Sequence, residues 1–202
     1  MSPAKRSAEA TARLRASLIE HARQLIAREG ASALTTRALA AEAGCAVGLP
    51  YKIFADRREL VTAIVDAELD QLRAACAELV QSAGTGTVGG NLTRFATAFL
   101  DSPAIALSQE IFADAALRQA VADTAENGGM GPSAFPDVLS RYLTAEKQAG
   151  RVAAHVDEHA FGYLIASTLH NLLIAGKEWP HPTRPALEQM LTATATAIAA
   201  GQ

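Results

Sequence analysis

Apolar residues recur along most of the chain three and four positions apart, which is the spacing of amphipathic helices. Residues 1–9 are polar and predict a disordered arm. The segments with helical spacing are about 10–29, 56–81, 92–101, 103–126, 138–150, 157–178 and 185–200. No stretch of any length alternates apolar and polar residues as a strand does, so the pattern predicts an all-α fold.

Two segments of the second half stand out. Residues 157–178 are apolar on more than one face, which indicates a helix buried in a core or against a partner. Ser82–Asn91, SAGTGTVGGN, is the clearest break in composition, and its glycines satisfy the G-x-G-x-x-G spacing of dinucleotide-binding loops. That fingerprint requires a preceding strand, and a helix is predicted here, so we interpret the segment as a linker.

Residues 35–60 predict two short helices and the start of a third. Thr35 and Thr36 are suited to cap a helix, and Gly44 is suited to end it in the left-handed conformation. A short turn leads to a second short segment that carries Tyr51. This succession of short helix, tight turn and short helix is the helix-turn-helix pattern.

The third helix of this region has its own start signal. Asp56 and Glu59 stand three residues apart, which is the spacing of a capping box with Asp in place of Ser or Thr. Phe54, just before it, is interpreted as a core residue. We therefore expect a helix to begin at Asp56 and to continue to about Gln81.

The distribution of charge differs between the two ends of the chain. The whole chain has a net charge of −3, but residues 1–60 hold ten basic and six acidic residues, a net charge of +4 that leaves −7 for the remainder. A basic N-terminal module on an acidic body favours phosphate binding at one end only.

Composition argues against a membrane protein, a secreted protein and a protein built around disulfides or zinc. The chain has no apolar run long enough to cross a membrane, and the polar N-terminus lacks the apolar core of a signal peptide, so we expect a cytoplasmic protein with no membrane partner. Cys45 and Cys76 are too few and too far apart for a disulfide framework or a zinc site. His155 and His159 flank the expected helix start at Asp157, so a surface pair is favoured over a metal site.

The helix-turn-helix region carries an ordered set of residues over 26 positions. They are the pair Thr35 and Thr36, Ala43 and Gly44, Gly48, Tyr51 and Phe54, Arg57 and Leu60. This set resembles the DNA-binding region of the TetR (tetracycline-repressor) family of bacterial regulators.

The resemblance implies contacts with double-stranded operator DNA by Thr35, Thr36, Arg37, Ala46, Val47, Gly48, Leu49, Tyr51, Lys52 and Arg57. By their positions in the motif, Thr35, Thr36, Tyr51 and Arg57 are expected to bind phosphates of the DNA backbone. Lys52 can reach a phosphate or a base edge. Val47 and Gly48 are expected to face the major groove, with Leu49 offering an apolar contact such as one to a thymine methyl. Ala46 stands at the expected N-cap of the recognition helix.

The resemblance also implies a two-domain arrangement. Residues 1–60 would form the DNA-binding domain, linked by helix 56–81 to a ligand-binding and dimerisation domain, residues 82–202. The helices 157–178 and 185–200 would pair with those of a second copy as a four-helix bundle, giving a homodimer that matches a palindromic operator. The central helices would enclose a pocket for a small-molecule effector, with candidate lining residues Phe95, Phe99, Phe112, Phe135, Tyr142, Phe161 and His170.

We therefore expect a ligand-responsive transcriptional regulator, a repressor released from its operator by a small apolar effector. No local motif joins a nucleophile to a base, so we expect no enzyme activity, no cofactor and no metal. Ala46, Leu49 and Pro50 differ from the residues usual in the family. They leave open a dimeric helical ligand-sequestering or adaptor protein that does not bind an operator.

Overall fold

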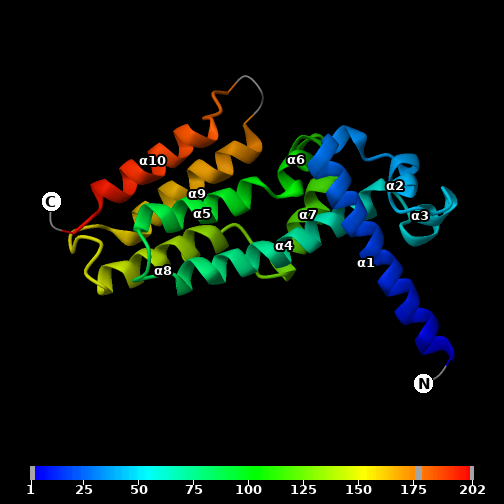
Figure 1. The fold of residues 1–202 in the computed structure, drawn as a ribbon, viewed down its shortest axis with the longest axis horizontal. Helices are drawn as coiled ribbons and strands as arrows, with labels where there is room; N and C mark the ends of the chain where they lie inside the picture. The colour runs from blue at the N-terminus through cyan, green and yellow to red at the C-terminus, as the bar shows by residue number, and fades with distance from the viewer. Residues whose placement is uncertain (1–2, 176–178, 201–202) are drawn as a thin grey trace. The chain divides into compact units, whose positions relative to one another are not determined.

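The computed structural model describes residues 3–175 and 179–200, and these residues confirm the predicted all-α fold (Figure 1). Within them there is no strand, only an isolated bridge between Val152 and Ala199. The elements are α1 (Pro3–Glu29), the 3₁₀ helix η1 (Ala31–Ala33), α2 (Thr36–Glu42), α3 (Gly48–Ile53), α4 (Arg57–Gln81), α5 (Val88–Leu100), α6 (Pro103–Ala113), α7 (Ala115–Asn127), α8 (Ala134–Gln148), α9 (Glu158–Ile174) and α10 (Arg184–Ala197). None of the described helices combines the length and apolar character that crossing a membrane requires.

The prediction of a disordered N-terminal arm is wrong from Pro3 onward. Helix α1 begins at Pro3 and is 27 residues long, so the polar residues that precede the periodic segment are helical. Proline is well tolerated in a first helical turn, and the alanines that follow it have the highest helix propensity. Polarity alone therefore did not distinguish a disordered arm from a solvated helix.

The chain divides into two compact units that interleave in sequence. The first contains Met1–Glu68 and Ser102–Thr124, and the second contains Leu69–Asp101 and Ala125–Gln202. The boundaries at Glu68 and Thr124 fall inside α4 and α7. Helix α6, which the sequence groups with the C-terminal domain, clusters with the N-terminal residues because it packs on α1 and η1.

The core of the first unit is built on one face of α1. Leu18, Ala22, Leu25 and Ile26 lie on this face and are buried, each less than 4% exposed. Leu39 of α2 and Phe54, just after α3, are buried in the same unit. Phe54 is therefore a core residue, as the sequence predicts.

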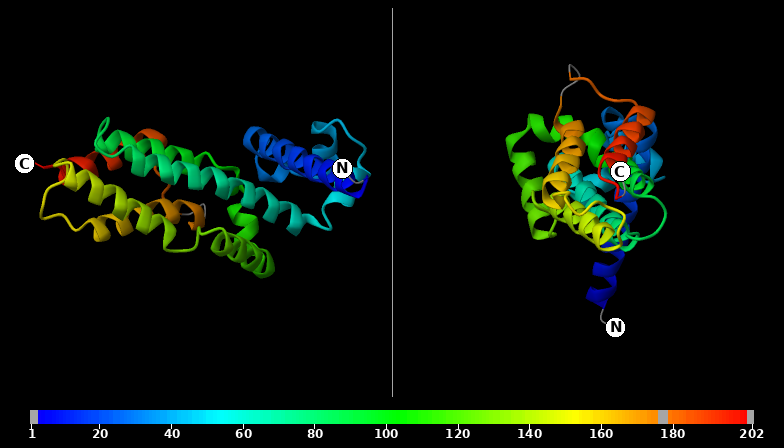
Figure 2. Two further views of the ribbon diagram at one scale, coloured as in Figure 1. Left: turned by 90° about the horizontal axis from the view of Figure 1, so that it is seen from below. Right: turned by 90° about the vertical axis from the view of Figure 1, so that its left-hand side faces the viewer.

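In the second unit, α8 packs along α9 and α5 packs along α10 (Figure 1 and Figure 2). The close approach of α8 and α9 depends on Gly162. A Cβ atom at this position would lie 2.6 Å from Ser140 Oγ and 2.8 Å from Ser140 N. The absence of a side chain at Gly162 thus allows the backbones to meet.

The connection between α4 and α5 is held by a buried polar side chain. Asn91, 2% exposed, donates from Nδ2 to Ser82 O at 3.2 Å, to Thr85 O at 3.0 Å and to Tyr142 Oη at 3.1 Å. Tyr142 is fully buried, and burial is the main reason why the pKa of its phenol is raised. Residues 82–87 form an ordered link between two helices, which agrees with the interpretation as a linker. Residues 88–91, which the sequence assigned to the same linker, are instead the first residues of α5.

The same connection is bonded to a buried carboxylate of α8. Glu146, 0% exposed, accepts from Gly84 N at 3.1 Å and from Arg151 Nε at 3.0 Å through its Oε2 atom. Gly84 has a φ of 80°, which a residue with a side chain adopts only at a cost. The glycine and the carboxylate together fix the course of the backbone between α4 and α5.

Replacing Asn91 by Ala should destabilise the protein, because it removes four side-chain hydrogen bonds. Two of them hold the α4–α5 connection to α5, one joins α5 to Tyr142 of α8, and one is accepted from Arg94. We expect a loss of about 2 kcal/mol in the free energy of unfolding, measured by urea denaturation. The matched control is Asn127→Ala, whose side chain is exposed on α7. Equal unfolding midpoints for Asn91→Ala and wild type would contradict this account of the connection.

Candidate nucleic-acid interface

The first short helix of the predicted motif begins where the sequence indicates. Thr35 is its N-cap, with extended backbone, and its Oγ1 accepts from Ala38 N at 3.1 Å. The helix ends at Glu42 with Ala43 as its C-cap. Gly44 follows with a φ of 60°, and the turn closes through a bond from Cys45 N to Ala40 O at 2.9 Å. The predicted helix and turn are therefore confirmed.

The second short helix, α3, starts one residue later than expected. Its N-cap is Val47 rather than Ala46, and Val47 makes no side-chain capping bond. Ala46 lies just outside the helix, where its carbonyl accepts from Leu49 N at 2.9 Å. Pro50 lies in the first helical turn, where an amide hydrogen would have no helical partner. Local backbone bonds thus begin α3 without a capping side chain.

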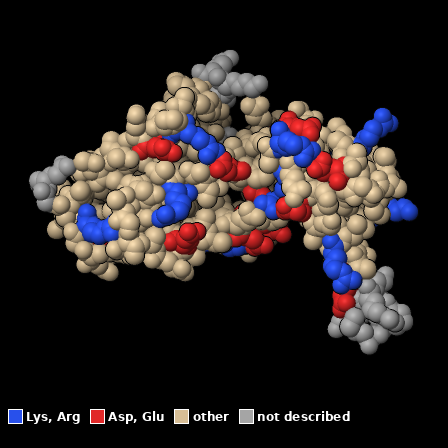
Figure 3. All heavy atoms as spheres, in the orientation of Figure 1, with Lys and Arg blue, Asp and Glu red and all other residues tan. Residues whose placement is uncertain are grey.

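Most residues predicted to contact DNA lie on the surface of these two helices and their turn. Val47 is 48% exposed and Tyr51 is 65% exposed. Thr35, Arg37, Ala46, Gly48 and Lys52 are exposed as well, whereas Thr36 and Leu49 are half-buried. Figure 3 shows lysine and arginine side chains projecting from the side of the first unit that carries α2 and α3, away from acidic side chains.

Arg57, the remaining residue of that set, is bonded within the first unit. Its Nε and Nη2 atoms donate to the two carboxylate oxygens of Glu110 on α6 at 2.6 and 2.7 Å. Its Nη1 atom donates to the backbone carbonyl of Leu34. The bonds to Glu110 raise the pKa of Arg57 above its usual value. The sequence offers no signal for this partner, which lies 53 positions away.

The start of α4 forms the predicted capping box only in part, because the Glu59 carboxylate bonds to the backbone of Ala55 and not to that of Asp56. Glu59 N donates to Asp56 Oδ1 at 2.8 Å, and Glu59 Oε2 accepts from Ala55 N at 2.7 Å. Arg15 of α1 adds a bond to Glu59 Oε1 at 2.7 Å and lies 4.5 Å above the ring of Phe54. The bonds from Ala55 and Arg15 lower the pKa of Glu59. The cap therefore also ties α4 to α1.

The residues predicted to line an effector pocket do not line one common cavity. Phe95 and Phe99 of α5 meet Phe135 of α8, with ring centroids 6.1 and 5.1 Å apart respectively. Tyr142 is buried close by in the same unit, and Phe161 is half-buried on α9. The other two are exposed, Phe112 on α6 of the first unit and His170 on α9. The structure brings together only the aromatic residues of α5 and α8.

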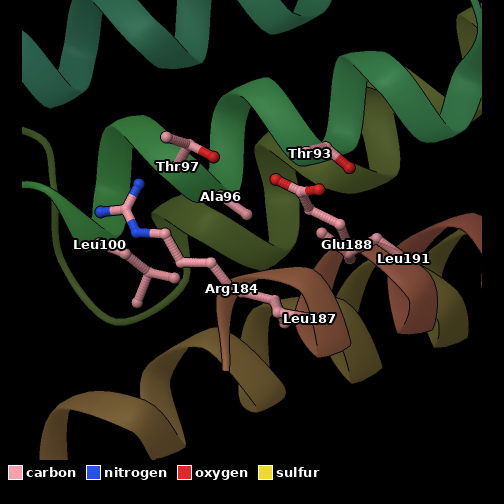
Figure 4. Close-up of a pocket in the computed structure, with 8 residues that line it drawn as sticks. All are labelled: Thr93, Ala96, Thr97, Leu100, Arg184, Leu187, Glu188 and Leu191. Carbon is pink, nitrogen blue, oxygen red and sulfur yellow. The ribbon is translucent and has the colours of Figure 1, made fainter. Parts of the chain in front are cut away.

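A shallow hollow lies between α5 and α10 (Figure 4). Its volume of about 10 Å³ corresponds to roughly one water molecule. It is lined by Thr93, Ala96, Thr97 and Leu100 of α5 and by Arg184, Leu187, Glu188 and Leu191 of α10. A hollow of this size is too small for a drug-sized effector.

Residues 18–64, which include the whole helix-turn-helix, match the family described as "Bacterial regulatory proteins, tetR family". These residues form a TetR-family domain. The match confirms the resemblance seen in the sequence.

Several solved protein structures share the fold over almost the full length of the chain. A TetR-family transcriptional regulator from Agrobacterium tumefaciens has a TM-score of 0.67 at 16% identity, with 94% of this chain and 100% of that chain covered. The ketosteroid transcriptional regulator KstR2 of Mycobacterium tuberculosis has a TM-score of 0.53 at 19% identity, with 93% and 95% covered. The multidrug binding protein EbrR, complexed with imidazole, has a TM-score of 0.52 at 17% identity, with 93% and 96% covered.

No curated protein sequence matches the chain significantly. At identities below 20% the structural likeness establishes the fold alone. The TetR-family domain and this shared fold are thus the two findings on which a functional proposal can rest.

Replacing Glu59 by Gln should destabilise the TetR-family domain at neutral pH but not at acidic pH. Because the pKa of Glu59 is lower in the folded state, its stabilisation is present above its unfolded pKa and is lost as the pH falls through the folded value. For this partly solvated group we expect a loss of about 0.5 kcal/mol at pH 7. Thermal unfolding of both proteins at pH 7 and near pH 3 measures the difference, and an equal difference at both pH values would contradict the role of the carboxylate.

Proposed function

We propose that the protein is a DNA-binding transcriptional regulator that responds to a small molecule. The observation that carries this proposal is the TetR-family helix-turn-helix, whose second helix exposes Val47, Tyr51 and Lys52 to solvent. An exposed short helix behind a tight turn is the element that such motifs insert into the major groove. In this proposal the protein is not an enzyme.

Residues of α2 and α3 would make two kinds of contact with DNA, one to phosphates and one to base edges. The hydroxyls of Thr35, Thr36 and Tyr51 are suited to donate to phosphate oxygens, which fixes the position of the protein on the duplex. Val47 and Gly48 at the start of α3 would approach base edges, and Lys52 adds positive charge on the same helix. Leu49, being half-buried, would offer only part of its side chain to a base.

We further propose that the protein is a homodimer through α9 and α10. Tyr163, Leu164 and Ile174 of α9 are 48–63% exposed, and Met190 of α10 is 50% exposed. Large apolar side chains exposed on these two helices favour burial against a partner. Residues 176–178, which the sequence assigns to the end of this interface, lie outside the described residues. A two-fold dimer would match a palindromic operator.

The proposed effector is a small, largely apolar molecule. Two proteins share the fold: KstR2 is named a ketosteroid transcriptional regulator, and EbrR is named a multidrug binding protein. The aromatic cluster of Phe95, Phe99 and Phe135 supports an apolar site in the second unit. To act as an inducer, the molecule must bind the arrangement that cannot bind DNA more tightly than the one that can. The protein would then be a repressor released from its operator.

Selection of bound duplexes from a random DNA pool tests the proposal. The expected result is a palindromic consensus whose affinity falls steeply with salt, because bound phosphates release counterions. No enrichment at low salt would contradict operator binding and would favour a dimeric sequestering or adaptor protein.

Tyr51→Phe should weaken binding to every duplex by a similar factor, because a phosphate contact carries no sequence information. Loss of one hydrogen bond of about 1 kcal/mol corresponds to roughly a fivefold loss in affinity. Ser133→Ala is the control, since it removes an exposed hydroxyl of the second unit that makes no capping bond. Unchanged affinity of Tyr51→Phe for the selected and for unrelated duplexes would exclude the phosphate contact.

Leu164→Glu should dissociate the dimer, because it places a charge in an interface that is proposed to be apolar. Sedimentation should show a monomer for this variant at concentrations where wild type is a dimer. Ala77→Glu, which adds the same charge at an exposed position of α4, should remain a dimer. A dimer of unchanged stability for Leu164→Glu would rule out this face.

A further inference from the structure

Helix α6 is hydrogen-bonded at both ends to elements of the helix-turn-helix unit. Toward its C-terminus, the carboxylate of Glu110 receives both bonds from Arg57, at 2.6 and 2.7 Å. At its N-terminus, the capping residue Ser102 donates from Oγ to Glu68 Oε2 at 2.7 Å. Glu68 is 4% exposed and also accepts from Arg23 of α1. The helix is therefore fixed at two separated points within one compact unit.

The guanidinium of Arg57 connects α6 with the start of the first DNA-facing helix. Its Nη1 atom donates to the carbonyl of Leu34, and Leu34 directly precedes Thr35, the N-cap of α2. The side chain of Leu34 is 1% exposed, so this residue is anchored from both its side chain and its carbonyl. One planar group thus holds α6 and the turn at residues 34–36 together.

This geometry is poorly suited to a direct contact between Arg57 and a phosphate. Three donor hydrogens of the guanidinium are already used, and the carboxylate of Glu110 compensates its charge at close range. A phosphate at Arg57 would meet the negative charge of Glu110 as well as the arginine. Bidentate pairing also fixes the plane of the guanidinium, which limits its ability to turn toward DNA.

We propose that Arg57 and Glu110 are positioning residues, through which α6 fixes the turn that presents Thr35 and Thr36 to operator phosphates. The inference rests on the proposed DNA-binding function. It assigns to Arg57 a role different from the phosphate contact that its motif position predicts.

The two roles of Arg57 predict opposite effects of Glu110→Gln. If the pair positions the turn, loss of the carboxylate loosens it, and operator affinity should fall by roughly threefold or more. If Arg57 binds phosphate and Glu110 merely restrains it, the same change removes a repelling charge and frees the arginine, so affinity should rise. Asp66→Asn is the control, because it removes one negative charge at an exposed position of the same unit.

The double variant Arg57→Ala with Glu110→Gln removes one charge of each sign and separates the roles by salt dependence. A lost phosphate contact should reduce the slope of log affinity against log salt by about 0.9. A lost positioning pair should lower the affinity and leave the slope unchanged, because hydroxyl contacts release no counterions. A reduced slope would overturn the proposal.

Amide hydrogen exchange of the DNA-free protein gives a readout that does not depend on operator binding. Glu110→Gln should accelerate exchange at residues 34–39, and Asp66→Asn should not. Failure of wild type to select any duplex would overturn the proposed function, whereas exchange would still test the contact. Unchanged exchange at residues 34–39, or operator affinity in Glu110→Gln equal to or above that of wild type, would overturn the positioning role.

Discussion

Burial of one face of α1 is the interaction on which the helix-turn-helix unit depends. Helices α2 and α3 have seven and six residues, and helices of this length are unstable in water without tertiary packing. Leu18, Leu25 and Ile26 supply the apolar surface against which they are held. The bond from Arg15 to Glu59 then ties the start of α4 to the same helix. Packing on the apolar face of α1 thus holds α3 in place and leaves its other face exposed to solvent.

The charges of this unit have two separate uses. Of its basic residues, Arg15, Arg23, Arg28 and Arg57 are paired with the carboxylates of Glu59, Glu68, Glu42 and Glu110 respectively. Because Glu68 and Glu110 lie outside residues 1–60, the net charge of +4 for that segment overstates the positive charge that is free to attract DNA. Arg37 and Lys52, both exposed, are better placed to attract it. The ion pairs stabilise the unit from within, while Arg37 and Lys52 keep its surface basic.

Local signals in the sequence predicted the helix-turn-helix well. The cap at Thr35, the left-handed Gly44 and the bond from Glu59 N to Asp56 involve residues within five positions of each other, so spacing alone indicates them. Pairs far apart in sequence were not predictable in this way. Nothing near Arg57 indicates Glu110, because their meeting depends on how α6 packs.

For the candidate effector site too, the sequence did not predict which residues meet across different helices. The candidate residues Phe95, Phe99 and Phe135 do meet, although Phe135 lies outside the predicted helix 138–150 and belongs to α8, which begins at Ala134. The same candidate set also contained Phe112 and His170, which are exposed, because a position in a predicted helix does not reveal the element against which its side chain packs. Asn91, which holds the α4–α5 connection, has no apolar character and so escaped a search for aromatic residues.

The central claim is that the protein binds operator DNA as a dimer, with one helix-turn-helix on each half-site. The most direct test is equilibrium binding of wild-type protein to a full palindrome and to a duplex that keeps only one half-site. The account predicts two protomers on the full palindrome and a much weaker complex on the half-site, because the second contact is then lost. Equal affinity for the two duplexes, or binding to neither, would contradict it.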